Sequence, residues 1–337
     1  LANIYGEIKQ HELSISQYKK ALQANPNSAP TLFNLAQAYI ELSNTENAIE
    51  SLLQVIQVEP SFIKARRQLV KIYLKKEKLI SALLHLKQLA NVNANDINAH
   101  ISIGKIYNKL GNIKLAIETI SPIILRNPNN IRARETLAEI FYKEEKFDDS
   151  IAEYRYILEQ NSKYLPAYIQ LGWVYYRQGK FQMATAWTKR GLKLGSSSPQ
   201  LNSLATMNLG LYAWLNDDYA AAKKWYRKAV EQGDPLAMFL LGQMFETETL
   251  NAPSNVRAAN LYISAANKGH AAAQARLAQF YEQGRGVPQD FAEAAMWYTE
   301  AAQQWEVSAR YPLGATYAIG RGNYTNSSEA IRWFERA

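Results

Sequence analysis

Apolar and polar residues alternate along this chain with a helical period, in short runs that come in pairs. Within residues 29–60, apolar side chains between Leu32 and Tyr39 fall on one helix face, and a second such run follows after Asn44. Asn44 is a short polar residue that favours a turn or a helix cap, and Pro60 ends the pair because proline cannot continue a helix. The pattern predicts two antiparallel helices joined by a short turn.

The same pair recurs along the first part of the chain at a step of 34 residues. At each step a small or short residue stands on the first helix, where a neighbouring helix is expected to cross closely. The clearest of these positions are Gly104, Ala138 and Gly172. A fixed period in this range predicts helical hairpins stacked one after another.

The period changes near residue 199. From Ala222 through Ala258 and Ala294 to Ala330 the step is 36 residues, and the change follows Gly-Ser-Ser-Ser-Pro at 195–199, the most linker-like run in the chain. The sequence therefore predicts two domains, residues 1–199 and 200–337, each built of hairpins. The cleanest copy of the longer unit is 277–302, with the motif G-x-G-V-x-x-D in its turn.

The first set of hairpins resembles the tetratricopeptide repeat (TPR), with Leu, Gly or Ala and Tyr on the first helix and Ala, an aromatic residue and Pro on the second. The second set resembles the Sel1-like repeat, a relative with a longer glycine-containing loop. The resemblance implies an all-α, right-handed superhelical α-solenoid of about ten hairpins, six TPR-like and four Sel1-like. The first and last hairpins look truncated, so we expect the sequence to be a piece of a longer protein.

Little in the composition points to catalysis or to a cofactor. The chain has no Cys, and its 4 His are scattered without the spacing of metal ligands. Gly-Arg-Gly at 284–286 and 320–322 lacks the Lys-Ser/Thr of a phosphate loop, and Asp pairs at 148–149 and 217–218 suit helix starts. No apolar run approaches the ~20 residues of a membrane span. We predict a non-enzymatic protein without metal or cofactor.

The strongest candidate for binding is a basic stretch around residues 64–87. Its eight basic residues are opposed by the single acid Glu77, in a chain of net charge +8. The cations at 64, 67, 71 and 75 recur at helical spacing and form one face, although such a run is often only a solvated surface. The resemblance implies that first helices line a concave groove, and the candidate groove residues are Lys64, Arg67, Lys71, Lys75, Lys105, Tyr142, Trp173 and Tyr176.

Some TPR proteins clamp the carboxylate of a peptide C-terminus with two Asn, a Lys and an Arg. Asn3, Asn34, Arg67 and Lys71 occupy the matching positions, with the last two types exchanged. Lysine where the family has arginine weakens bidentate binding of the carboxylate.

The predicted function is a protein–protein interaction scaffold that binds an acidic peptide segment or tail. The alternative is an anionic polysaccharide-binding guide in exopolysaccharide secretion, in which cations hold the charges and aromatic rings supply flat contact area. Nucleic acid is the least favoured partner, because no base-stacking module is present. The combination of repeats resembles bacterial envelope scaffolds, including those of exopolysaccharide export, and this resemblance alone favours the periplasm over the cytoplasm.

Overall fold

The computed structural model describes residues 2, 10–195, 197–247, 254–320 and 326–337. Within these residues it contains nineteen α-helices and no β-strand. The predicted all-α fold is confirmed. The chain divides into two compact units, Leu1–Gln160 (unit 1) and Asn161–Ala337 (unit 2).

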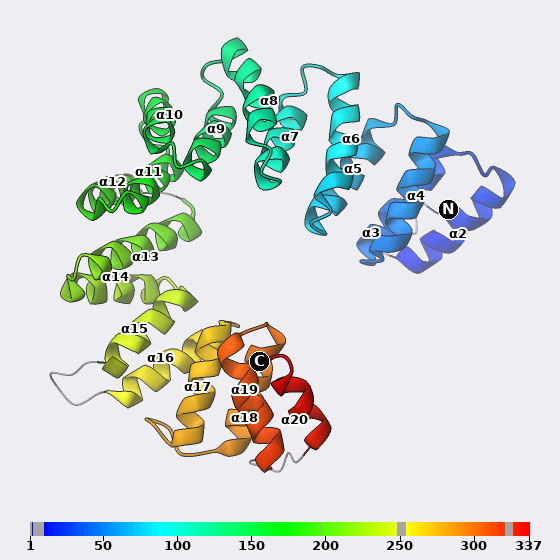
Figure 1. Cartoon of the computed structure of the whole chain (residues 1–337). Coiled ribbons are helices and arrows are strands. Elements are labelled where there is room, and N and C mark those ends of the chain that lie inside the picture. The colour runs from blue at the N-terminus through cyan, green and yellow to red at the C-terminus, as the bar shows by residue number, and fades with distance from the viewer. Residues whose placement is uncertain (1, 3–9, 196, 248–253, 321–325) are drawn as a thin grey trace. The chain divides into compact units, whose positions relative to one another are not determined.

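Unit 1 is a series of hairpins in which each first helix packs against the second helix that follows it (Figure 1). Its helices are α2 (His11–Ala24), α3 (Ala29–Glu41), α4 (Thr45–Val58), α5 (Ile63–Lys75), α6 (Leu79–Val92), α7 (Ile97–Lys109), α8 (Ile113–Arg126), α9 (Ile131–Lys143) and α10 (Phe147–Gln160).

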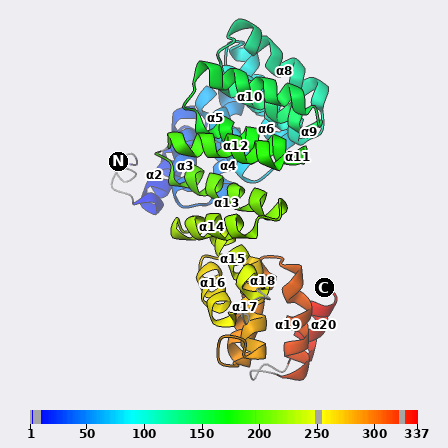
Figure 2. The same cartoon turned by 90° about the vertical axis from the view of Figure 1, so that its left-hand side faces the viewer.

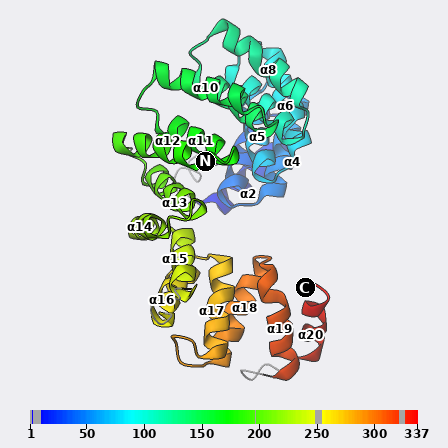
Figure 3. The same ribbon diagram turned by 60° about the vertical axis from the view of Figure 1, so that its left-hand side comes forward.

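Unit 2 continues the same architecture. Its helices are α11 (Leu165–Arg177), α12 (Phe181–Leu194), α13 (Pro199–Leu215), α14 (Tyr219–Glu231), α15 (Pro235–Thr247), α16 (Asn255–Asn267), α17 (Ala271–Gln283), α18 (Phe291–Gln303), α19 (Val307–Ile319) and α20 (Ser327–Phe334). Figure 2 shows the hairpin of α13 and α14 followed by α15. Figure 3 shows α15–α16, α17–α18 and α19–α20 as three successive hairpins.

The helix starts reproduce the period that the sequence predicts. First helices begin at residues 29, 63, 97, 131 and 165, and second helices at residues 45, 79, 113, 147 and 181. The predicted change of repeat type near residue 199 falls inside unit 2, where α12 ends at Leu194 and α13 begins at Pro199. The boundary between the two repeat types at residues 199 and 200 stays a prediction.

Small residues allow the two helices of a hairpin to approach closely, as the sequence predicts. A Cβ atom added to Gly104 would lie 2.7 Å from the Ile120 side chain, and one added to Gly172 would lie 2.1 Å from Thr188 Oγ1. Ala138 is fully buried and its carbonyl accepts a hydrogen bond of 2.9 Å from the Ser150 hydroxyl. These positions are therefore fixed by packing.

The Gly-Arg-Gly turn at 284–286 has a structural role in the hairpin of α17 and α18. Gly284 ends α17 in the left-handed conformation, with φ 66°. Gly286 also has positive φ, and a Cβ there would lie 2.3 Å from the carbonyl oxygen of Asn255 at the start of α16. Asp290 then caps α18 through its side chain. The second Gly-Arg-Gly, at 320–322, lies partly outside the described residues.

None of the helices in the described ranges is both long and apolar enough to cross a membrane.

Candidate partner-binding surface

One face of α5 carries the basic residues that the sequence singles out. Lys64, Arg67, Lys71 and Lys75 are all exposed, whereas Arg66 between them is buried. Arg67 forms an ion pair with Asp96. The three lysines form no ion pair with any of the described residues. Three like charges on one helix face repel each other, and this repulsion favours binding of an anion.

Arg67 is held in place by the next hairpin. Its Nη2 lies 3.0 Å from Asp96 Oδ2, and the Asp96 side chain is only 11% exposed. Asp96 also accepts a hydrogen bond from the Ala99 amide at 3.1 Å and so caps α7. A hollow of about 210 Å³ opens beside this pair, with Val70, Leu89, Asn98 and Ser102 among its lining residues. The basic face therefore borders a small cavity with an apolar wall.

Side chains of the next two first helices, α7 and α9, contact each other. Lys105 on α7 lies 3.7 Å from Glu139 on α9. Arg132 on α9 donates to Asn98 Oδ1 on α7 at 2.7 Å, and Lys143 Nζ donates to the carbonyl of Asn108 at 2.6 Å. Because Glu139 offsets the charge of Lys105, the positive charge of the candidate residues is concentrated on α5.

The three aromatic candidates are partly buried and packed against other rings. Tyr142 on α9 lies 6.1 Å from Phe147 between ring centroids. Trp173 and Tyr176 on α11 stack on each other at 4.8 Å, and the ring of Tyr212 on α13 lies 5.7 Å from that of Tyr176. The structure thus brings Trp173 and Tyr176 together in an aromatic cluster of unit 2, while the α5 lysines belong to unit 1. The groove that the sequence analysis predicts for these rings and the lysines stays a prediction.

The carboxylate clamp has one member outside the described residues, Asn3. Asn34 lies on α3, and Arg67 and Lys71 lie on the exposed face of α5. The clamp also stays a prediction.

A second basic surface, which the pattern of first helices does not predict, lies on the second helices α12 and α14. The Trp225 ring on α14 has two ammonium groups over it, Lys189 Nζ from α12 at 5.8 Å and Lys228 Nζ at 5.6 Å. α12 has no acidic residue, and α14 has one, Glu231. The exposed cations of this α12/α14 surface are Lys189, Arg190, Lys193, Lys224, Arg227 and Lys228. Lys223 is partly buried, with its Nζ 4.4 Å from the centre of the Phe245 ring on α15. Counting charges on second helices as well as first helices would have revealed it.

A charge cluster centres on the buried carboxylate of Glu246, at the end of α15. Its carboxylate accepts hydrogen bonds from Arg276 Nε at 3.0 Å and from the Tyr262 hydroxyl at 2.9 Å, and Arg285 Nη1 lies 3.0 Å away. Burial raises the pKa of Glu246, but the hydrogen bonds and the two guanidinium charges outweigh it and leave the pKa below the ordinary value.

A similar contact recurs in the next hairpin, where Tyr298 donates to Glu282 at 3.0 Å. Because it repeats with the hairpins, we assign the Glu246 cluster to packing. Among the described residues, no group of three His, Asp or Glu side chains is placed to hold a metal ion.

Comparisons with known proteins agree with the repeats seen in the structure. Sequence profiles described as tetratricopeptide repeats match residues 9–75, 97–130, 135–199 and 169–237. The profile described as the Sel1 repeat matches residues 235–270, 271–304 and 307–337. No curated protein sequence matches the chain.

Solved structures of similar fold are repeat proteins. A tetratricopeptide repeat protein from Parabacteroides merdae is 18% identical over 71% of this chain and 94% of that chain, with a TM-score of 0.56. A protective antigen of uropathogenic Escherichia coli strains, displaying an SLR fold, is 19% identical over 96% of this chain and 71% of that chain, with a TM-score of 0.50. At these identities the likeness establishes the solenoid fold alone.

Proposed function

The chain belongs to the tetratricopeptide-repeat and Sel1-repeat proteins, and we propose that it is a non-enzymatic scaffold that holds an acidic segment of a partner protein on the basic face of α5. Repeats of these two families generally mediate protein–protein interaction, because stacked hairpins present an extended surface. We also propose a location in a bacterial cell envelope, on the resemblance of the repeat combination to envelope proteins.

The observation that carries the proposal is a set of three exposed lysines, unpaired among the described residues, beside a paired arginine. Lys64, Lys71 and Lys75 are available to carboxylates of a partner, and Arg67 is already oriented by Asp96. The apolar wall of the neighbouring hollow offers contact for one side chain of the same segment. An acidic peptide with an apolar residue matches the charge of this surface and the apolar wall beside it.

Charge reversal tests the proposal directly. We expect the triple variant Lys64→Glu, Lys71→Glu and Lys75→Glu to bind an amidated hexaglutamate peptide about tenfold more weakly or worse than the parent, as measured by fluorescence anisotropy. The matched control reverses the same number of charges elsewhere, with Lys20→Glu, Lys114→Glu and Lys163→Glu, all of which are exposed. Equal affinity of the two variants for the peptide would reject the α5 face as the binding surface.

The α12/α14 surface favours a second candidate function, binding of an anionic polysaccharide. Here two ammonium groups lie close to the indole of Trp225. Sugar rings pack on flat aromatic faces, and neighbouring cations can hold their carboxylates. Trp225→Ala is expected to weaken binding of an oligogalacturonate probe and to leave hexaglutamate binding unchanged. If the oligogalacturonate binds the parent and Trp225→Ala equally well, this second function is wrong.

A further inference from the structure

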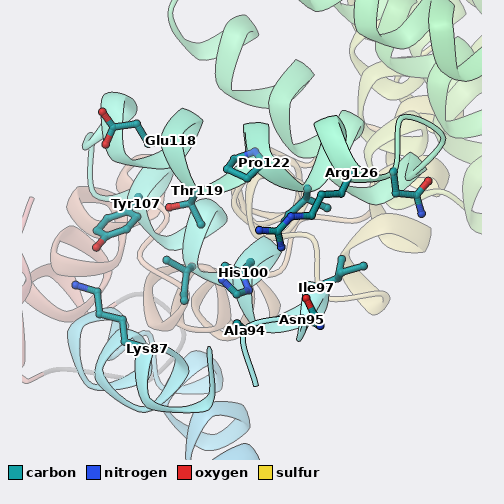
Figure 4. Close-up of a pocket in the computed structure, with 13 residues that line it drawn as sticks. Lys87, Ala94, Asn95, Ile97, His100, Tyr107, Glu118, Thr119, Pro122 and Arg126 are labelled. Carbon is teal, nitrogen blue, oxygen red and sulfur yellow. The ribbon is translucent and has the colours of Figure 1, made fainter. Parts of the chain in front are cut away.

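A pocket of about 650 Å³ opens between the second helices α6 and α8, with α7 as its floor. It lies apart from the α5 face, so a ligand bound in it is independent of the proposed function. Figure 4 shows His100 at its centre, with Lys87 and Tyr107 on one side and Arg126 on the other. Ile97, Ile103, Pro122 and Ile123 are among its apolar lining residues.

In the hairpin before it, the corresponding place is filled by an arginine. Arg66 of α5 is only 9% exposed, donates from Nη2 to the carbonyl of Pro60 at 2.7 Å, and also donates to Gln88 of α6. Buried His85 belongs to the same place, where burial and the charge of Arg66 lower its pKa. The hairpin of α5 and α6 is therefore closed at this point.

The hairpin after it is closed in the same way. Arg134 of α9 pairs with Glu153 of α10 at 2.5 Å, and both side chains are largely buried. Its guanidinium lies 3.6 Å from the centre of the Tyr156 ring. A stacked, paired arginine thus seals the groove between these two helices.

The middle hairpin has a shorter side chain at each of these positions. The 34-residue step places His100 where the neighbours have Arg66 and Arg134, Thr119 in place of His85 and Glu153, and Pro122 in place of Gln88 and Tyr156. The His100 ring turns to its own helix, with Nδ1 2.9 Å from the carbonyl oxygen of Asp96. The pocket is the volume that these three replacements leave open.

The charged groups that line the pocket are two cations, Lys87 and Arg126, and one acid, Glu118. Lys87 and Arg126 are exposed and form no ion pair within the described residues, although Lys87 Nζ lies 5.5 Å from the centre of the Tyr107 ring. The acid at the rim, Glu118, lies 3.9 Å from Lys114 outside the pocket. Two cations therefore face the cavity, and neither forms an ion pair with Glu118, the one carboxylate among its lining residues.

We propose that this pocket binds an organic anion in which a carboxylate is attached to an apolar body the size of a phenylalkyl group. The apolar body would lie against the three isoleucines and Pro122, and the carboxylate would lie at the rim, where the positive charges of Arg126 and Lys87 attract it from opposite sides. The imidazole of His100 stands between the two cations, where it offers a further polar contact.

Titration of the whole chain with 4-phenylbutyrate tests the site, with methyl NMR of the isoleucines as the readout. We expect shifts at Ile97, Ile103 and Ile123 and none at Ile49 of α4. The uncharged analogue 4-phenylbutan-1-ol should bind about tenfold more weakly, because it forms no charge-assisted contact. The proposal is overturned if these three methyl groups do not respond, or if acid and alcohol bind equally.

A filled-pocket variant gives the sharper control. His100→Arg, Thr119→Glu and Pro122→Tyr together copy the closed hairpin of α9 and α10, and should abolish binding while the thermal unfolding temperature stays at or above that of the parent. Should that variant fail to fold, Arg126→Gln and Lys87→Gln change exposed residues only. Each is expected to weaken phenylbutyrate binding by about threefold to tenfold. Unchanged affinity in both single variants would contradict the proposal.

The same chemistry has two sources, the end of a peptide chain and a small organic acid. A pentapeptide ending in Leu with a free carboxylate, and the same peptide amidated, distinguish them. Tighter binding than phenylbutyrate, lost on amidation, assigns the site to a chain end. Weaker binding of both peptides assigns it to a small acid, and either result supports the pocket. Equal binding of the peptide and its amide, at least as tight as that of phenylbutyrate, would contradict a carboxylate site.

Discussion

At the scale of single residues, Gly172 and Gly104 occupy equivalent positions with different surroundings. A Cβ on Gly172 would meet Thr188 Oγ1 at 2.1 Å and the Ala184 carbonyl at 3.2 Å, whereas one on Gly104 would meet mainly the flexible end of Ile120. We therefore expect Gly172→Ala to lower the free energy of unfolding by about 1–3 kcal/mol. Gly104→Ala should lower the free energy of unfolding by a smaller amount, and urea denaturation of both variants measures the difference. A larger loss for Gly104→Ala would contradict this account of the packing.

Glu246 provides a prediction about pH. Its pKa lies below the ordinary glutamate value in the folded chain, so its ionised form adds stability at neutral pH that is lost as the pH falls through the folded-state pKa. Glu246→Gln should lower the free energy of unfolding by about 1–3 kcal/mol at pH 7, because it removes the charged acceptor of Arg276 and Tyr262.

The stability difference between parent and Glu246→Gln should shrink as the pH drops below the ordinary glutamate pKa, in urea denaturation at a series of pH values. Glu300→Gln, at an exposed position of α18, is the matched control and should change little at any pH. A difference that stayed constant with pH would show that the Glu246 charge contributes nothing to folding.

At the scale of elements, the second helices of the last three hairpins begin at equivalent cap positions 36 residues apart. Asp290 accepts hydrogen bonds from the amides of Ala292 and Glu293 at 2.9 and 3.1 Å, whereas the Ser254 side chain makes no cap bond to α16. Asp290→Ala should cost about 1 kcal/mol of unfolding free energy, and Ser254→Ala should be nearly neutral. Equal losses in thermal unfolding would show that the Asp290 cap adds no stability.

At the scale of the whole molecule, the repeats were predictable because each packing position recurs at a fixed step. Gly104, Ala138 and Gly172 could be identified from the sequence for this reason. The pairing of Arg67 with Asp96 was not predictable, because it depends on how one hairpin sits against the next. The sequence analysis missed the pocket at His100 for a related reason. The pocket becomes apparent only when His100 is compared with the larger residues at the equivalent positions of the flanking hairpins.

A stack in which each hairpin contacts only its neighbours should lose stability locally. Leu69 on α5 is fully buried in a core cluster that extends from α3 to α7. Leu69→Ala should lower local stability by about 2–5 kcal/mol, and hydrogen exchange measured by mass spectrometry should accelerate in α4–α7 but not in α15–α18. Leu277→Ala on α17 should give the reverse pattern, because it is buried in the cluster around α15–α17. Faster exchange throughout both units from either substitution would mean that the chain unfolds as one cooperative body, and the additive description of its hairpins would then be wrong.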